Sequence, residues 1–279
     1  MGDWDPDLYH RFRRYRAEPF EAILARLENG SAEQRFVDRT VDRIVDLGCG
    51  TGENTAELAR RFAGCTMVGM DSSPAMIDRA LKLREGLEPA LRERLSFVLG
   101  DIREFKAKHD PSREYSMIFS NAALQWLSEH REIFTRCFEA LAPGGRLVVQ
   151  VPANDHETAQ VTLDAMAHEE PWRAALAGVK PPSATVAAPE VYARMLAKIG
   201  FDRIDCYYHT FHHPMSSPAE IVEWCRATVL RRYVDLLDQA LREPFVEALT
   251  ARLERAYATR GPLTFNFRRL FIWAQRPAA

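Results

Sequence analysis

Short apolar runs recur along the first half of the chain, separated by segments in which apolar positions follow a helical spacing. Each run has the length of a β-strand, and the segments between the runs have the length of helices. The expected strands are Ile44–Leu47, Thr66–Met70, Leu95–Leu99, Tyr115–Ser120 and Arg146–Val151. The expected helices are Pro19–Leu27, Asn54–Phe62, Pro74–Leu83 and Arg131–Leu141. This alternation predicts an α/β fold in which helices cover both faces of a mostly parallel sheet.

The stretch APGGR, residues 142–146, stands between a predicted helix and a predicted strand. Glycine commonly ends a helix because it adopts a left-handed conformation at no steric cost. We therefore expect Gly144 and Gly145 to end the helix and to open the strand.

The alternation is interrupted twice beyond Pro152. A helix at Pro189–Ile199 and a strand at Arg203–His209 resume the pattern, and a strand at Arg268–Gln275 ends it. The remaining helical segments are Pro218–Arg226, Val229–Leu241 and Pro244–Thr259. We predict a Rossmann-like, doubly wound, mostly parallel seven-stranded sheet with residues 41–152 as its core. Residues 188–215 and 263–279 complete the sheet, while residues 153–187 and 216–262 form a helical cap.

The sequence RIVDLGCGTGENT, residues 43–55, places glycines at alternate positions directly after a predicted strand. Gly48, Gly50 and Gly52 permit a tight turn and close approach of a ligand, and the following helix start offers free N–H groups. The spacing departs from the dinucleotide fingerprint G-x-G-x-x-G, and no triphosphate-binding G-x-x-x-x-G-K-[ST] motif occurs. Asp46, just before the glycines, would repel a pyrophosphate but can pair with an ammonium group.

Two further acids end the next two predicted strands. Asp71 is placed to accept hydrogen bonds from ribose hydroxyls. Asp101 is placed to accept one from an adenine amino group, with Ile102 and Met76 as apolar walls for the ring. Three carboxylates at strand ends, without a basic residue in the glycine turn, suit a nucleoside that carries a positive charge and no phosphate. We predict that the ligand is S-adenosyl-L-methionine.

Composition narrows the class of protein. The formal net charge of -2 over 279 residues gives no reason to expect a nucleic-acid partner. No apolar run has the length of a membrane span, and the N-terminus lacks the apolar core of a secretory signal. We therefore expect a soluble, cytoplasmic protein, with a monomer favoured. The five cysteines are scattered without a C-x-x-C pair, which argues against a zinc site and a disulfide framework.

Four stretches resemble successive motifs of class I S-adenosylmethionine-dependent methyltransferases: VDLGCGTG, GMDSSPAMI, GDI and FSNAALQWL. A closer likeness, to the trans-aconitate methyltransferases, extends over nearly the whole chain. It rests on DWDPDLYHRFRRYRAEPF, NAALQWLSEH, YYHTFHHPM, EIVEWCRATVLRRY and RRLFIWA. The resemblance implies transfer of a methyl group to a carboxylate of a small polycarboxylic acid, which gives a monomethyl ester.

The resemblance also implies that residues 1–40 fold over the cofactor, where Arg16 would meet its methionine carboxylate. The chain departs from the family pattern at Glu18, where a second arginine is expected. It departs again at Val229 and Arg232, where glycine and proline are expected in the region of the acceptor pocket. The candidate cofactor-binding residues are Arg16, Asp46, Gly48, Gly50, Asp71, Ser72, Met76, Asp101, Ile102 and Asn121.

Methylation of a carboxylate needs alignment and desolvation rather than a general base, because the carboxylate is already ionised at neutral pH. Gln125 and Trp126 follow the fourth strand, at the edge where transfer is expected. The cap must supply cations for the acid, and arginine offers a bidentate fork. The candidates are Arg231, Arg232, Arg268 and Arg269, with His209, His212 and His213 behind them.

Other interpretations stay open. The acceptor can be a fatty acid, a carrier-bound acid, or a natural-product hydroxyl or amine, and a hydroxyl would need a base such as a histidine of HTFHHP. A binding module that only senses S-adenosylmethionine is a third hypothesis. The same histidines lack an acid or a cysteine at metal-binding spacing, so no metal site is predicted.

Overall fold

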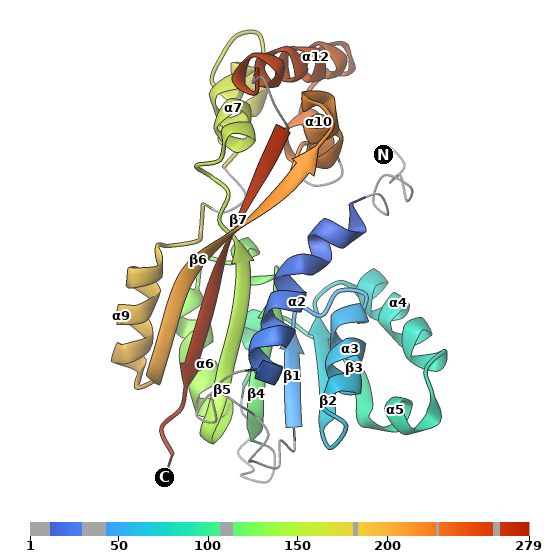
Figure 1. Cartoon of the computed structure of the whole chain (residues 1–279), viewed down its shortest axis with the longest axis vertical. Helices are drawn as coiled ribbons and strands as arrows, with labels where there is room; N and C mark the ends of the chain where they lie inside the picture. Colours follow the sequence, from blue (N-terminus) through green and yellow to red (C-terminus); the bar gives the residue numbers. More distant parts are fainter. Residues whose placement is uncertain are drawn as a thin grey trace. The chain divides into compact units, whose positions relative to one another are not determined.

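Seven strands form one sheet in the part of the chain that the structure describes, in the order β3-β2-β1-β4-β5-β7-β6 (Figure 1). The computed structural model describes residues 12–29, 43–106, 114–180, 184–226, 229–258 and 263–278. The strands are β1 (Arg43–Leu47), β2 (Thr66–Asp71), β3 (Leu95–Leu99), β4 (Tyr115–Asn121), β5 (Leu141–Pro152), β6 (Asp202–Met215) and β7 (Leu263–Gln275). This order confirms the predicted Rossmann-like, doubly wound sheet.

The sheet is parallel from β3 to β5. Strand β7 runs the other way: Gly144 N–H, early in β5, donates to Arg276 O, whereas Ala153 N–H, just after the end of β5, donates to the earlier Arg268 O. The strand order reverses between β1 and β4. In open α/β sheets, ligands bind outside the carboxyl ends of the strands at such a reversal. The glycine turn after β1 and Asn121 at the end of β4 both lie at this place.

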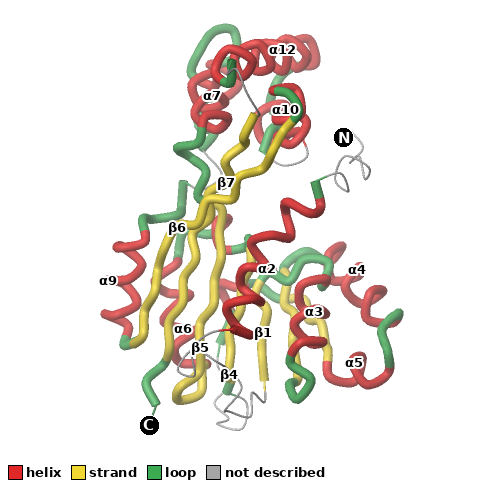
Figure 2. Tube along the Cα trace, viewed as in Figure 1, coloured by secondary structure: helices red, strands yellow, loops and turns green. Residues whose placement is uncertain are grey.

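Helices flank the sheet (Figure 2). Contacts join α3 to β2 and α4 and α5 to β3, and α6 packs against α9. The helices are α2 (Arg13–Asn29), α3 (Glu53–Arg61), α4 (Pro74–Glu85), α5 (Pro89–Arg94), α6 (His130–Ala140), α7 (Thr158–Ala167), α8 (Arg173–Leu176), α9 (Pro189–Ile199), α10 (Pro218–Arg226), α11 (Arg231–Val234) and α12 (Gln239–Ala256). Two short 3₁₀ helices, η1 (Ile102–Glu104) and η3 (Leu124–Trp126), follow β3 and β4.

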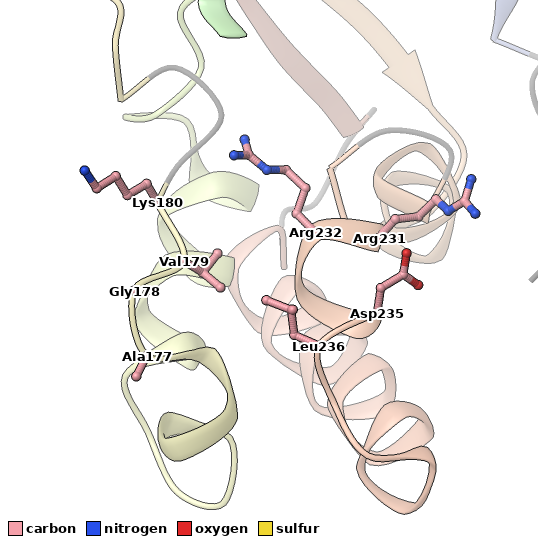
Figure 3. Close-up of a pocket in the computed structure, with 8 residues that line it drawn as sticks. All are labelled: Ala177, Gly178, Val179, Lys180, Arg231, Arg232, Asp235 and Leu236. Carbon is pink, nitrogen blue, oxygen red and sulfur yellow. The ribbon is translucent and has the colours of Figure 1, made fainter. Parts of the chain in front are cut away.

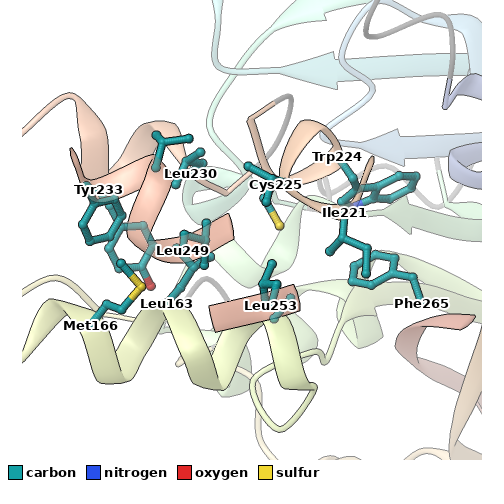
Figure 4. Packing of buried hydrophobic residues seen from close by; sticks show 14 of the residues in the cluster. Leu163, Met166, Ile221, Trp224, Cys225, Leu230, Tyr233, Leu249, Leu253 and Phe265 are labelled. Atoms are coloured by element: carbon teal, nitrogen blue, oxygen red, sulfur yellow. The ribbon is translucent and has the colours of Figure 1, made fainter. Parts of the chain in front are cut away.

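Two compact units make up the chain. The helical unit comprises Met1–Glu18, Pro152–Ala184 and His209–Arg269, and the sheet unit comprises the rest. The helical unit has an apolar core of its own, in which α7, α10 and α12 bury residues such as Leu163, Trp224 and Leu249 (Figure 4). The predicted functional division into cap, core and N-terminal segment stays a prediction, and residues 1–11 and 30–40 of that segment lie outside the described residues.

The predicted helix end at Gly144 and Gly145 is wrong. Helix α6 ends at Ala140, and the next residue, Leu141, already begins β5. Gly144 has φ 75° inside the strand, where its N–H donates to Arg276 O. The glycine pair therefore permits an irregularity within β5 rather than a helix cap.

Two prolines predicted to begin helices lie inside them. Helix α2 begins before Pro19, and α12 begins before Pro244. Proline costs one intrahelical hydrogen bond, yet both helices bury an apolar face that includes Phe20 and Phe245, and packing outweighs local propensity. The helix predicted at Val229–Leu241 is also wrong, because only the four residues of α11 and the first residues of α12 are helical there. The last position of the next predicted helix, residue 259, lies outside the described residues.

Candidate functional site

The glycine turn joins β1 to α3 in the sheet unit. Gly48 and Gly50 have φ values of 80° and 55°, which side chains with a Cβ rarely adopt. A Cβ added at Gly48 would overlap the Cβ of Ala123, whereas one added at Gly50 would meet no atom within 4 Å. The turn thus packs against the chain after β4 at Gly48 and leaves open space at Gly50, where a ligand can approach the backbone.

Asp71 connects two of the turns at this edge of the sheet. Its Oδ2 accepts from Gly50 N–H at 2.9 Å, and its Oδ1 accepts from Ser73 N–H at 2.9 Å. A carboxylate oxygen can accept two hydrogen bonds, so each oxygen of Asp71 keeps capacity for a ligand hydroxyl. Ser72, which lies between Asp71 and Ser73 in the sequence, is exposed. The carboxylate is therefore fixed in position before any ligand arrives.

Asp46 is the buried acid of this region, with 2% of its surface exposed. Its Oδ2 accepts a 2.6 Å hydrogen bond from the Thr55 hydroxyl. Burial raises the pKa of Asp46 to about 7, the Thr55 hydrogen bond opposes the rise, and the charge of Asp71 adds to it. A ligand ammonium would stabilise the ionised form of this carboxylate.

Asp101 is engaged by its own neighbour. Its Oδ1 accepts from Arg103 N–H at 2.8 Å, and Arg103 Nη2 lies 2.6 Å from Oδ2. The Arg103 hydrogen bonds hold the pKa of Asp101 below its usual range. Ile102 is buried near the glycine turn, with Cδ1 3.5 Å from the position of a Cβ on Gly48, whereas Met76 is exposed on the first turn of α4. Ile102 thus lies beside the turn that Asp71 braces.

Three amide side chains gather around the carboxyl end of β4. Asn121 pairs in register with Gln150 of β5, and the next residue, Ala122, has φ 55°. Gln125 Nε2 donates to Ala122 O at 2.7 Å. Three buried atoms here have no hydrogen-bond partner: Asn121 Oδ1, Gln125 Oε1 and Gln150 Nε2. Buried polar atoms are normally satisfied, so this cluster is poised for a polar ligand group.

A buried hydrogen-bond chain holds the turn that carries Gln125. His130 Nε2 lies 2.9 Å from Leu124 O and therefore carries the proton, while Nδ1 accepts from the Tyr192 hydroxyl at 2.6 Å. The Thr185 hydroxyl donates to Gln125 O at 2.7 Å. Trp126 follows with 60% of its surface exposed, so it is not a core residue.

The helical unit contains a pocket of about 650 Å³ (Figure 3). Arg231 and Arg232 line it, but Figure 3 shows their side chains pointing away from each other. The full lining is Ala177, Gly178, Val179, Lys180, Arg231, Arg232, Asp235 and Leu236. His209 is exposed and packs against Phe211 at a ring distance of 4.4 Å.

A second cluster of the helical unit gathers residues that lie far apart in sequence. Arg269 is 6% exposed, and its burial, together with the smaller effect of the Arg16 charge, lowers its pKa to about 9. His213 is fully buried, and burial and the charge of Arg269 lower its pKa to about 4. Glu18 Oε2 lies 3.5 Å from His213 Nδ1. Arg268, the neighbour of Arg269, instead donates from Nε to Ala153 O at 3.0 Å.

Comparisons with known proteins show to which family the chain belongs. The methyltransferase-domain family matches residues 44–145. A protein named trans-aconitate 2-methyltransferase from Acidovorax ebreus is 36% identical over 99% of this chain and 99% of its own length. One of the same name from Paracidovorax citrulli is 36% identical over the full length of both chains. The chain belongs to the trans-aconitate 2-methyltransferase family.

Membership of the trans-aconitate 2-methyltransferase family confirms the predicted class of enzyme, with S-adenosylmethionine as methyl donor. The phosphoethanolamine N-methyltransferase 2 of Haemonchus contortus has a similar fold, with a TM-score of 0.54 and 20% identity. That likeness covers 93% of this chain and 52% of the other. It supports the fold alone, because one fold hosts many reactions.

The structure brings the predicted donor-site residues of this family member together only in part. Asp46, Asp71, the glycines, Ile102 and Asn121 meet at one edge of the sheet unit, while Arg16 and the candidate arginines belong to the helical unit. Gln150 was missed, although its polar side chain within the apolar run RLVVQVP was a signal for it. Within the described ranges, no group of three or more His, Cys, Asp and Glu residues could hold a metal ion. None of the described helices has the length and apolar character needed to cross a membrane.

Proposed function

We propose that the protein transfers the methyl group of S-adenosylmethionine to a carboxylate of a small polycarboxylic acid, with trans-aconitate as the first candidate. The observation that carries this proposal is the similarity to proteins named trans-aconitate 2-methyltransferase, which spans both units of the chain. A match confined to the sheet unit would support donor binding only, because acceptor choice resides outside a shared donor fold.

The residues of the sheet unit fit the donor. Asp71 would bind the ribose hydroxyls, since both its oxygens are held in place and retain accepting capacity. Gly48, Gly50 and Ser72 would lie along the ligand, where Gly50 leaves open space. Asp46 would face the ammonium group, and Asn121 offers a buried oxygen without a partner.

Asp101 is proposed to receive the adenine amino group, with Ile102 and Met76 beside the ring. The ion pair with Arg103 occupies both carboxylate oxygens in the structure. The pair is exposed, and such pairs contribute little free energy. An adenine amino group can therefore share the carboxylate or displace the guanidinium.

S-adenosylmethionine supplies an electrophilic methyl group on a sulfonium, which an acceptor carboxylate attacks in line, leaving S-adenosylhomocysteine. The acceptor is its own nucleophile, so the protein must orient it and exclude water. Gln125 is proposed to contribute to orientation, because its Oε1 is buried without a partner while its backbone is held by Thr185. The exposed indole of Trp126 is proposed to contact the acceptor.

The acceptor's remaining carboxylates require cations. Arg231, Arg232 and His209 are the predicted residues, and these assignments stay predictions. The first two line the pocket of Figure 3 together with Lys180, which gives that pocket three cationic residues and one acid. The predicted monomeric state and cytoplasmic location also stay predictions.

Methyl transfer from labelled S-adenosylmethionine to a panel of acceptors tests the proposal. The panel contains trans-aconitate, saturated tricarboxylates, dicarboxylates, a monocarboxylate, a fatty acid, a phenol and an amine. We expect label in the tricarboxylates and dicarboxylates, with trans-aconitate highest in kcat/KM. Label only in the phenol or the amine would contradict the proposal and move attention to the acceptors that need a base.

A further inference from the structure

Arg269 is a buried cation whose charge no anion of the described protein balances. It is 6% exposed, and its Nε and Nη1 have no hydrogen-bond partner. The guanidinium lies over an aromatic face instead: its carbon is 3.9 Å from the centroid of the Phe267 ring. An unpaired buried charge is costly, and native proteins retain one chiefly where a partner binds it.

A second guanidinium increases the local positive charge. Arg16 lies close enough to Arg269 for its charge to lower the pKa of Arg269, after the larger effect of burial. The guanidinium of Arg16 lies 5.2 Å from the centroid of the Trp224 ring. Each guanidinium thus lies against an aromatic face, which attracts a cation. The positive charges of the two arginines repel each other, and an anion between them would relieve that repulsion.

His213 adds a neutral polar group to the same cluster. It is fully buried, and neither ring nitrogen has a hydrogen-bond partner. With its pKa lowered to about 4, the ring is neutral at physiological pH and offers one N–H donor. Tyr15 stacks on it at a centroid distance of 4.3 Å. Glu18 approaches this ring rather than forming an ion pair with Arg269.

We infer that Arg269 and Arg16, with the N–H of His213, form a binding site for a carboxylate. Arginine presents a planar fork that matches a carboxylate, and the site is walled by Phe267 and Trp224. The inference rests on the proposed function, which requires the protein to hold acceptor carboxylates that are not methylated. A flat unsaturated polycarboxylate suits aromatic walls, so we assign the site to the acceptor. The methionine carboxylate of the donor has the same chemistry, so it is the alternative ligand of this site.

Calorimetry on the full chain tests the site without turnover. Arg269→Gln removes the charge and keeps polar atoms, and Arg252→Gln is the matched control, because Arg252 forms an exposed ion pair with Glu169 in the same unit. S-adenosylhomocysteine is titrated into each protein alone, and trans-aconitate is titrated in its presence. We expect Arg269→Gln to weaken trans-aconitate binding about 100-fold while Arg252→Gln leaves it unchanged.

The two sources of the carboxylate give different results. Weaker trans-aconitate binding with unchanged S-adenosylhomocysteine binding assigns the site to the acceptor. Weaker S-adenosylhomocysteine binding alone keeps the carboxylate site but assigns it to the donor. If Arg269→Gln leaves both affinities unchanged, the inference is wrong.

Folding and function are separated by two further readouts. Because Arg269→Gln removes an unbalanced buried charge, we expect its melting temperature without ligands to equal or exceed that of the wild type. Arg269→Lys keeps the charge but loses the fork, and we expect it to recover only part of the affinity. If the wild type binds citrate or trans-aconitate through Arg269 but methylates neither, the proposed function fails while the carboxylate site stands.

Discussion

The Asp71 carboxylate of the sheet unit and the Arg269–His213 cluster of the helical unit differ in how far the protein itself satisfies their hydrogen bonds. In the sheet unit, the carboxylate of Asp71 accepts backbone hydrogen bonds from the turns on either side. In the helical unit, Arg269 and His213 have buried nitrogens without hydrogen-bond partners. The Asp71 carboxylate is thus held by backbone N–H groups, whereas the Arg269 guanidinium and the His213 ring are not held by such bonds. A substitution of Asp71 should therefore disturb both structure and binding, and one of Arg269 should disturb binding alone.

The largest expected effect is that of Asp71→Ala. The substitution removes the proposed ribose acceptor and leaves the N–H groups of Gly50 and Ser73 without their partner. We expect the Kd for S-adenosylhomocysteine to rise about 100-fold or more in calorimetry. Asp78→Ala removes an exposed acid of α4 and should leave the Kd unchanged. Unchanged binding by Asp71→Ala would show that the nucleoside lies elsewhere.

Gly48→Ala should destabilise the protein. The added Cβ would overlap Ala123, and alanine at φ 80° is strained. We expect a loss of about 1–3 kcal/mol in the free energy of unfolding, measured by denaturant titration. The control is Gly64→Ala, since a Cβ there meets no atom within 4 Å. Equal stability of the two variants would contradict the packing of the turn against the chain after β4.

Asp46 should make donor binding depend on pH. Its pKa of about 7 means that the acid is largely neutral below that pH and cannot pair with an ammonium group. We expect affinity for S-adenosylhomocysteine to rise about tenfold between roughly pH 6 and pH 7.5. Asp46→Asn should remove that slope, and a wild-type profile as flat as that of the variant would argue against the ammonium contact.

The raised pKa of Asp46 also changes the stability of the ligand-free protein with pH, in the direction opposite to ligand affinity. Burial raises the pKa of Asp46 in the folded protein from 3.8, the ordinary value for an aspartate, to about 7, so the folded state binds the proton more tightly than the unfolded state. Stability from this group is present at low pH and is lost as pH rises from about 4 to about 7. Ligand-free protein and ligand affinity should therefore respond in opposite directions over this range.

The smallest expected effect is that of Arg231→Ala. Arg231 is exposed at the pocket of Figure 3, where solvent weakens any ion pair that it makes with an acceptor. We expect the KM for the acceptor to rise about threefold to fivefold, with unchanged donor binding. Arg255→Ala, an exposed change on α12, serves as control. A KM equal to that of the control would remove Arg231 from the acceptor site.

The sequence predicted the strands, turn and helix start around Asp46 and Asp71 well, because their signals are local. The acids follow directly on apolar runs, and the glycines lie within a few residues of Asp46, so strand, turn and helix start could be read together. The boundaries at Pro19 and Pro244 could not be predicted in this way, because packing of distant apolar faces overrides the proline preference. The cluster of Arg16, His213 and Arg269 was equally hidden: only the fold brings these positions together.

Product identification tests the central claim, carboxyl methylation, most directly. Trans-aconitate is incubated with the protein and S-adenosylmethionine labelled in the methyl group, and the product is treated with mild alkali. The account predicts a labelled product that alkali converts back to trans-aconitate with release of labelled methanol, as a methyl ester requires. A labelled product that survives alkali, or no product from an enzyme that binds S-adenosylhomocysteine, would contradict it.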